Sequence, residues 1–359
     1  MRTAVVILNW NTRTYLQAFL PSVVAACREL GEDPATGLPC AEAVVADSGS
    51  TDGSDALMAE AFPDVRFLPL GANYGFTGGY NRALAALDGF DCFLLLNSDI
   101  LVENGFLTPL CDWMQAHPDC GVCGPKLLAL EQDGKEWRKT TRFEYAGAAG
   151  GLLDRFGYPF CRGRVLSRVE EDRGQYDTPA RVLWVSGACM MVRSSLWKDL
   201  GGFDDRFFAH MEEIDFCWRA AHAGWKVTVV PQSKVWHLGG GSLPQDSPFK
   251  LELNYRNNLL LLENNLAAEA CARGCSPKRA QRSARCAIFR RMLLDGCSAV
   301  VYLLRGRFSA CRAVCSAHRQ FRKLRRGVPV PEGPRPAPAE GLFPGIVILQ
   351  YLKQNENHH

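Results

Sequence analysis

The sequence predicts an α/β fold in which helices flank a mostly parallel central sheet. Over the first hundred residues, short apolar runs alternate with stretches of helical periodicity, and clusters of turn-forming residues separate them. A polar residue follows several of these runs at the point where a strand would end. Ligands of such sheets bind beyond the carboxyl ends of the strands, so a binding site is expected there.

The first strand is predicted over 3–8, a continuous apolar run of the kind that is buried on both faces of a parallel sheet. A loop, Asn9–Asn11, separates it from a helix with apolar periodicity. Small residues over 48–53 form a turn, and Ser54 begins the next helix. The other elements expected in this half are a helix over 14–30, a strand over 43–46, a helix over 54–61, a strand over 65–68, a helix over 78–87 and a strand over 92–96.

The second half is less regular. Residues 125–185 contain many glycine, arginine and aromatic residues, which favours loops and short strands. Residues 182–192 are predicted to form one buried strand, interrupted at Gly187. The later elements expected are a helix over 212–223, a strand over 226–230, a glycine run over 239–241, basic helices over 248–326 and a proline-rich linker over 328–338.

The net charge of +3 conceals a basic segment. Residues 273–327 hold fifteen lysines and arginines and one acid, which suggests contact with an anionic membrane surface; a solvated helical face is the alternative, and nucleic acid is not expected. No uncharged apolar run reaches the roughly 18–20 residues that span a bilayer. The fifteen cysteines and the short apolar start, which is no export signal, predict reduced thiols and a cytoplasmic location, with the membrane's inner face as a docking place.

Two segments near the predicted strand ends suggest a nucleotide site. Asn9 and Asp47 end the first two strands, where a short carboxylate can accept hydrogen bonds from a base or ribose. Asp52 lies in the turn after Asp47, where it can contact the bound nucleotide or cap the helix that follows. The segment 71–81 is rich in glycine, which permits close packing of a loop and helix start over a phosphate or sugar, and Gly75, Gly79 and Asn81 are the candidates for this contact. The segment lacks the spacing of a dinucleotide-binding turn.

A second cluster suggests a divalent cation. Asn97, Ser98 and Asp99 follow the apolar strand over 92–96, and a carboxylate there can hold Mg²⁺ or Mn²⁺, ions that prefer oxygen ligands and bridge phosphates. A simple turn acid is the alternative. His237 follows a later strand, and it would complete the metal's protein ligands if the fold brings it to Asp99.

A third cluster lies on the helix expected over 212–223. Glu213 falls in its first turn on the apolar side, where a poorly solvated carboxylate favours a chemical role. Burial raises the pKa of such a group and the helix dipole lowers it, so the sequence leaves the net direction open. Glu212 points elsewhere and is the alternative base. Asp215 is spaced to form an ion pair with Arg219. It is also a candidate for contact with an acceptor substrate.

Taken in order, eight segments resemble the inverting family-two glycosyltransferases with a GT-A fold, in particular rhamnosyltransferase-like members of bacterial polysaccharide assembly. The resemblance covers about residues 3–243 and continues weakly to about 325. Its segments are VVILNWN, VVADSGSTDGS, NYGFTGGYN, LLLNSD, VSGACMMVR, GGFDDRFF, EEIDFCWRA and VWHLGGGS. The sequence departs from the family at Asn97, where many members have an acid, and at Glu213, where aspartate is commoner.

The resemblance implies three domains. It implies a GT-A glycosyltransferase domain over 1–243, with a nucleotide-binding half over 1–100 and an acceptor half over 101–243. Beyond it come a basic helical region over 244–327 and a linker and tail over 328–359.

The resemblance also implies roles for individual residues. Asp47 would bind the nucleobase or ribose of a nucleotide-diphosphate sugar, with dTDP-rhamnose as a candidate. Asp99 and His237 would hold the metal, and Glu213 would be the catalytic base. Trp184, with a lid over 140–180, would shape the pocket of a glycan or lipid-linked acceptor. A catalytically inactive module that binds nucleotide sugars is the alternative, motivated by the two departures.

Overall fold

The computed structural model describes residues 1–134, 136–239, 247–329 and 336–349. Three predicted features therefore lie partly or wholly outside the described residues. They are the glycine run at Gly240 and Gly241, the linker over 330–335, and the end of the tail over 350–359.

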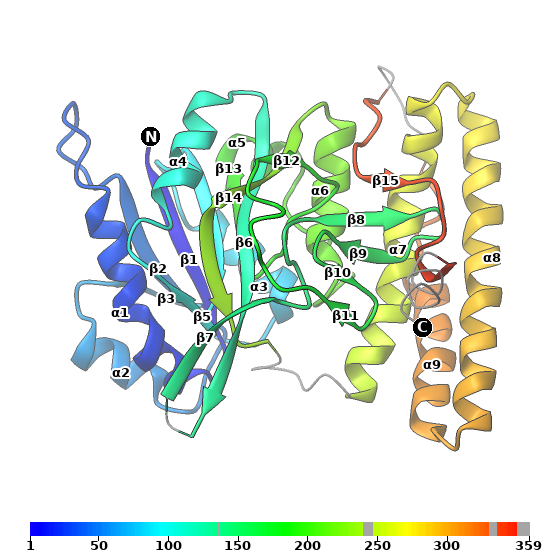
Figure 1. Cartoon of the computed structure of the whole chain (residues 1–359), viewed down its shortest axis with the longest axis horizontal. Coiled ribbons are helices and arrows are strands. Elements are labelled where there is room, and N and C mark those ends of the chain that lie inside the picture. The colour runs from blue at the N-terminus through cyan, green and yellow to red at the C-terminus, as the bar shows by residue number, and fades with distance from the viewer. Residues whose placement is uncertain (135, 240–246, 330–335, 350–359) are drawn as a thin grey trace.

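A mixed sheet forms the centre of the molecule (Figure 1). Within the described ranges it has ten strands in the order β12-β14-β6-β13-β4-β1-β2-β3, with β5 paired to β14 and β7 to β6. The strands β4, β1, β2 and β3 run parallel, as predicted. The other half is mixed because β13 runs antiparallel between β4 and β6. The strands are β1 (Thr3–Asn9), β2 (Ala41–Asp47), β3 (Arg66–Pro69), β4 (Cys92–Asn97), β5 (Ile100–Val102), β6 (Cys120–Asp133), β7 (Glu136–Phe143), β12 (Ala180–Arg181), β13 (Cys189–Arg193) and β14 (Lys226–His237).

Helices cover both faces of this sheet because its strands are apolar on both sides. Val5 and Ile7 of β1 face one core and Ala4 and Val6 the other, and all four are buried. The helices α1, α2 and α4 contribute to the first core, and α3, α5 and α6 to the second. These helices are α1 (Arg13–Glu29), α2 (Ser54–Ala61), α3 (Gly75–Ala85), α4 (Thr108–Ala116), α5 (Ser194–Asp199) and α6 (Glu212–His222).

The prediction for residues 182–192 was wrong in part. The segment is buried, but only β13 is a strand of the sheet; residues 182–188 form an irregular loop that turns at Gly187. Apolar composition alone does not separate a buried loop from a buried strand. Two other predictions fell short: β6 and β7 form a long hairpin where loops were expected, and β14 continues seven residues beyond Val230 to His237.

A second, smaller sheet lies between the central sheet and the C-terminal helices (Figure 1). Its order in the described part of the chain is β11-β10-β9-β8-β15. The last strand comes from the region expected to be a tail: β15 pairs in parallel with β8, and the Ala339 N–H donates to Glu269 Oε2 at 3.1 Å. The tail prediction was therefore wrong for this stretch. The strands are β8 (Gly151–Asp154), β9 (Pro159–Cys161), β10 (Arg164–Val165), β11 (Arg168–Val169) and β15 (Leu342–Phe343).

The basic region is helical, as predicted, and it stands at the end of the molecule farthest from α1 and α2 (Figure 1). Its helices are α7 (Pro248–Ala272), α8 (Pro277–Leu304) and α9 (Phe308–Leu324), and α7 also packs against α6. None of the helices in the described ranges combines the length and the apolar character needed to span a membrane.

Candidate active site

The ends of three neighbouring strands bring the predicted site residues together. In the parallel register, Asn9 of β1 lies opposite Asp47 of β2, and Leu8 lies opposite Asn97 of β4. Because these parallel strands pair in register up to their last residues, the side chains at their ends meet at one edge of the sheet. This edge is the carboxyl edge, where ligands of such sheets bind.

Asp47 organises the turn that follows β2. Its Oδ1 accepts from Asn9 Nδ2 at 2.6 Å, and its Oδ2 accepts from the N–H groups of Gly49 (3.1 Å) and Ser50 (2.9 Å). A carboxylate has about four acceptor positions, so one stays open for a ligand donor. The Asn9 amide is fully buried, and its Oδ1 accepts from Thr12 Oγ1 at 2.5 Å. Asn9 thus acts through Asp47 and the turn.

Asp52 makes its hydrogen bonds at the starts of two helices. Its Oδ2 accepts from the Arg13 N–H at 2.8 Å, and its Oδ1 accepts from the N–H and hydroxyl of Ser54 at 3.1 and 2.6 Å. The side chain therefore caps the starts of α1 and α2 together. The donor-binding prediction for Asp52 is replaced by this capping role.

The glycine-rich helix start also serves packing. Gly75 has φ +72°, and a Cβ there would lie 2.5 Å from Phe208 Cδ2; a Cβ on Gly79 would lie 2.7 Å from Leu8 Cδ2. Asn81 holds the loop before α6, because its Oδ1 accepts from the Phe203 N–H and its Nδ2 donates to the Phe203 carbonyl, both at 2.9 Å. The structure thus gives these residues partners within the chain and does not support direct donor contacts for them.

Asp99 and His237 meet, although 137 positions separate them in the sequence. β14 ends at His237, which pairs with Ile100 of β5, the residue after Asp99. His237 Nε2 lies 3.2 Å from Asp99 Oδ1, and both side chains are about nine-tenths buried. Asn97 Nδ2 lies 3.4 Å from the same ring nitrogen. Ser98 is half-buried in the turn between Asn97 and Asp99. The predicted juxtaposition is therefore present.

Glu144 is a site residue that the sequence reasoning missed. Its Oε1 lies 3.6 Å from His237 Nδ1, and its Oε2 accepts from the Ala146 N–H at 2.5 Å. Burial lowers the pKa of His237, but the charges of Asp99 and Glu144 outweigh it and raise the pKa to about 10. A carboxylate behind a histidine is the usual partner that orients a metal-binding ring. Glu144 lies in an irregular segment, and no spacing in the sequence identifies it.

Asp99 and His237 fit a divalent cation that is shared with a diphosphate. Such ions commonly take one or two protein side chains and complete their shell with phosphate oxygens and water. A carboxylate oxygen and an imidazole nitrogen 3.2 Å apart supply two ligands of this kind once the ion displaces the proton that the neighbouring carboxylates favour on the ring. Among the described residues, no group of three or more histidine, cysteine, aspartate or glutamate side chains is arranged to hold a metal by itself. The fit therefore depends on the diphosphate.

Glu212 and Glu213 begin α6, and each has a buried Oε2 atom without a hydrogen-bond partner. Burial raises the pKa of Glu213 to about 7, although backbone hydrogen bonds at the helix start partly offset it. Burial and the charge of Glu213 raise the pKa of Glu212 further. Adjoining carboxyl groups with buried oxygens resist ionising together, so at most one of the pair is readily deprotonated near neutral pH.

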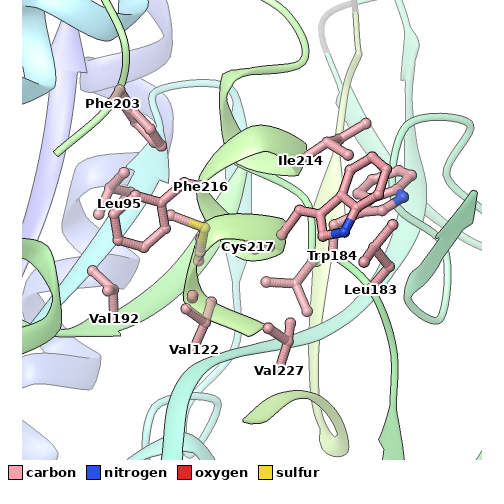
Figure 2. Close-up of a cluster of buried hydrophobic side chains, with 14 of the residues drawn as sticks. Leu95, Val122, Leu183, Trp184, Val192, Phe203, Ile214, Phe216, Cys217 and Val227 are labelled. Carbon is pink, nitrogen blue, oxygen red and sulfur yellow. The ribbon is translucent and has the colours of Figure 1, made fainter. Parts of the chain in front are cut away.

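The loop before β13 connects the two halves of the site. The Asn97 N–H donates to the Ala188 carbonyl at 2.9 Å, and a Cβ on Gly187 would lie 3.4 Å from Glu213 Cβ. The apolar side of α6, with Ile214 and Phe216, packs toward the central sheet (Figure 2). Glu213 and the end of β4 therefore border one short loop.

Two predictions for acceptor contacts were wrong. Trp184 is 3% exposed, and its Nε1 donates to the Leu152 carbonyl at 3.1 Å; Figure 2 shows its ring within the apolar cluster. Asp215 is fully buried, where Arg219 Nε donates to its Oδ2 at 2.8 Å. Its Oδ1 accepts from Asn264 and Asn265 of α7 at 2.9 and 2.8 Å. Burial leaves neither side chain exposed to a substrate in this structure.

Comparison with known proteins agrees with this geometry. A family model described as Glycosyl transferase family 2 matches residues 4–201, more than half of the chain. An N-acetylglucosaminyl-diphospho-decaprenol L-rhamnosyltransferase of Mycobacterium tuberculosis is 29% identical over 268 residues, covering 72% of this chain and 83% of that protein. Rhamnosyltransferase WbbL of Escherichia coli is 25% identical over 173 residues, covering 46% of this chain and 62% of that protein.

Among solved structures, GalNAc-T7 with UDP, GalNAc and Mn²⁺ superposes with a TM-score of 0.52 at 18% sequence identity. The superposition covers 71% of this chain and spans about half of that one, 47% of its length. At this identity the likeness concerns the fold, and it agrees with the GT-A architecture expected from the sequence. The chain belongs to glycosyl transferase family 2.

Proposed function

We propose that this glycosyltransferase moves a sugar, rhamnose from dTDP-rhamnose, onto a lipid-linked glycan with inversion of the anomeric configuration. The observation that carries the reaction type is Glu213, whose pKa is raised to about 7 and whose Cβ borders the same loop as the end of β4. The choice of sugar and acceptor rests on similarity to the mycobacterial rhamnosyltransferase over most of its length.

The proposed mechanism is a single in-line displacement. Glu213 takes the proton of the acceptor hydroxyl while the hydroxyl oxygen attacks the anomeric carbon, and the nucleotide diphosphate leaves from the opposite side. Asp47 binds the nucleoside through its open acceptor position. Asp99 and His237 are the residues expected to hold Mg²⁺ or Mn²⁺, which would supply charge neutralisation at the diphosphate.

A donor panel tests this function. The chain is incubated with dTDP-rhamnose and with other nucleotide-diphosphate sugars, with and without Mn²⁺ and a polyprenyl-diphosphate glycan, and products are identified by mass. We expect turnover with dTDP-rhamnose. Turnover with another donor alone would exclude rhamnose. Donor binding without transfer or hydrolysis under every condition would favour the inactive binding module.

We also propose that α8 docks this glycosyltransferase on an anionic membrane. One side of α8 packs inward through residues such as Ile288 and Ala299, while the opposite side exposes an apolar stripe flanked by exposed arginines. Arg291 does not contribute to this surface, because it is buried and paired with Asp295. The exposed stripe consists of Cys286, Phe289, Leu293, Cys297, Val300 and Leu304.

Serines at Phe289 and Leu293, which are 62% and 56% exposed, should weaken membrane binding. Each apolar side chain contributes about 1.5–3 kcal/mol when buried in a membrane, so the double substitution should lower the partition coefficient roughly tenfold or more. Flotation with phosphatidylglycerol–phosphatidylcholine vesicles measures this, with phosphatidylcholine vesicles as the reference. Leu38→Ser, at an exposed position far from α8, is the matched control. Equal flotation of both variants would contradict the docking proposal.

A further inference from the structure

The segment that leads into α6 has an unusual backbone. Phe208, His210 and Met211 have φ angles of +64°, +70° and +72°. Left-handed backbone is uncommon at residues other than glycine, and it persists only where the surroundings hold it in place. Met211 is the residue directly before α6, and Glu213 follows two positions later.

A buried side chain of α7 holds this segment. Asn257 is 0% exposed, and its Nδ2 lies 2.9 Å from the Phe207 carbonyl oxygen and 2.7 Å from each of the Ala209 and His210 carbonyl oxygens. The amide has two N–H groups, so the three carbonyls share them. Arg256 Nη2 donates to the Phe207 carbonyl as well, at 2.7 Å. The carbonyls that the left-handed turns direct toward α7 are thus satisfied by two adjacent residues.

The orientation of the Asn257 amide follows from its other contact. Arg256 Nε donates to Asn257 Oδ1 at 2.8 Å, so the oxygen faces the guanidinium and the NH₂ group faces the carbonyls. Arg256 is in turn anchored by Gln320 of α9, whose Oε1 accepts from Nη1 at 3.0 Å. The C-terminal helices therefore support the segment before α6 through an unbroken series of hydrogen bonds.

The same segment touches the rest of the site. The Thr77 N–H at the start of α3 donates to the Phe208 carbonyl at 3.1 Å, and the Phe208 ring packs against Gly75. Backbone groups at the helix start, Met211 among them, hydrogen-bond the Glu213 carboxylate and oppose the rise of its pKa caused by burial. A change of backbone conformation at 208–211 would move both the carboxylate and the groups that solvate it.

We propose that Asn257 is a positioning residue: it holds residues 207–211 in the conformation, left-handed at Phe208, His210 and Met211, that places the Glu213 carboxylate. The inference rests on the proposed role of Glu213 as the base. It extends the site to the C-terminal helices, since the residue that positions the base lies on α7 and its orienting partner is anchored on α9.

The test compares Asn257→Asp with Asn258→Asp. Both replace a buried amide by an isosteric carboxyl group without the NH₂ donor. Asn258 donates to the Gly157 carbonyl at 2.5 Å, and it meets the segment through the Met211 sulfur, at 3.9 Å, instead of through the backbone carbonyls. For N257D we expect faster amide hydrogen exchange in peptides covering 206–213. We also expect kcat to fall by up to about tenfold at an unchanged donor KM, because a small displacement of a catalytic group is costly. The acid limb of its pH–rate profile should also shift relative to N258D.

Arg256→Lys provides a second test in case N257D does not fold. It keeps the positive charge but cannot contact both Asn257 Oδ1 and the Phe207 carbonyl, so a smaller change in the same direction is expected. The hydrogen-exchange result does not depend on whether Glu213 is the base. Failure of the proposed function can therefore be distinguished from failure of the positioning role of Asn257. Equal exchange at 206–213 in N257D and N258D, or a uniform rise over α7 and the sheet with an unchanged pH profile, would overturn the proposal.

Discussion

Replacing Glu213 by glutamine is expected to lower kcat for sugar transfer by about 10²–10⁴, because proton removal by a positioned base contributes an effect of this size. Glutamine preserves the shape of the side chain at the start of α6, so donor binding should be unchanged. Glu212→Gln is the matched control, because it makes the same change at the adjoining carboxyl group and leaves Glu213 in place. Transfer rates and donor affinity are measured for both variants.

The pH dependence of kcat provides a second readout of the same residue. The pKa of Glu213 is raised to about 7 by burial, and a base acts in its deprotonated form. The rate should therefore rise as the pH increases through about 7 and be lost as the pH falls below it. Residual activity of E213Q should lack this acid limb. Unchanged turnover of E213Q, or a stronger loss in E212Q, would remove Glu213 from the base role.

Replacing Asp99 by alanine is expected to abolish metal-dependent donor binding. The substitution removes the carboxylate that lies 3.2 Å from His237 Nε2, and it leaves one protein ligand for a divalent ion. Calorimetric titration of dTDP with and without Mn²⁺ measures the effect: the gain in affinity that Mn²⁺ gives the unmodified protein should disappear.

Asp52→Asn is the control for this experiment. The structure assigns Asp52 to capping α1 and α2, so the substitution should lower stability by about 1 kcal/mol and leave the Mn²⁺ effect intact. Retention of the full Mn²⁺ effect in the Asp99 variant would refute the assignment of Asp99. Loss of the effect in the Asp52 variant would restore the donor-binding role that the sequence suggested.

Local features of the sequence were sufficient for the parallel half of the fold. The apolar run at 3–8 and the one at 92–96 became neighbouring strands, and Asn9, Asp47 and Asn97 came to one edge. A run of apolar residues is enough to predict a buried parallel strand, because the signal lies in adjacent residues. Parallel pairing of such strands then brings their carboxyl ends to one edge of the sheet. The C-terminal helical region was likewise predictable from its composition and periodicity.

Long-range packing decided what the sequence did not determine. Glu144 reaches His237 because β7 folds back on β6, the strand beside β14. Trp184 is buried because residues 182–188 form a loop within the core. Asp215 and Asn81 have the same polar groups as binding residues, but partners on α7 and in the loop before α6 already occupy them. The sequence by itself determined which polar residues stand at strand and helix ends. Only the tertiary structure decided which of them keep an unpaired atom, because hydrogen-bond partners far apart in the chain cannot be read from local spacing.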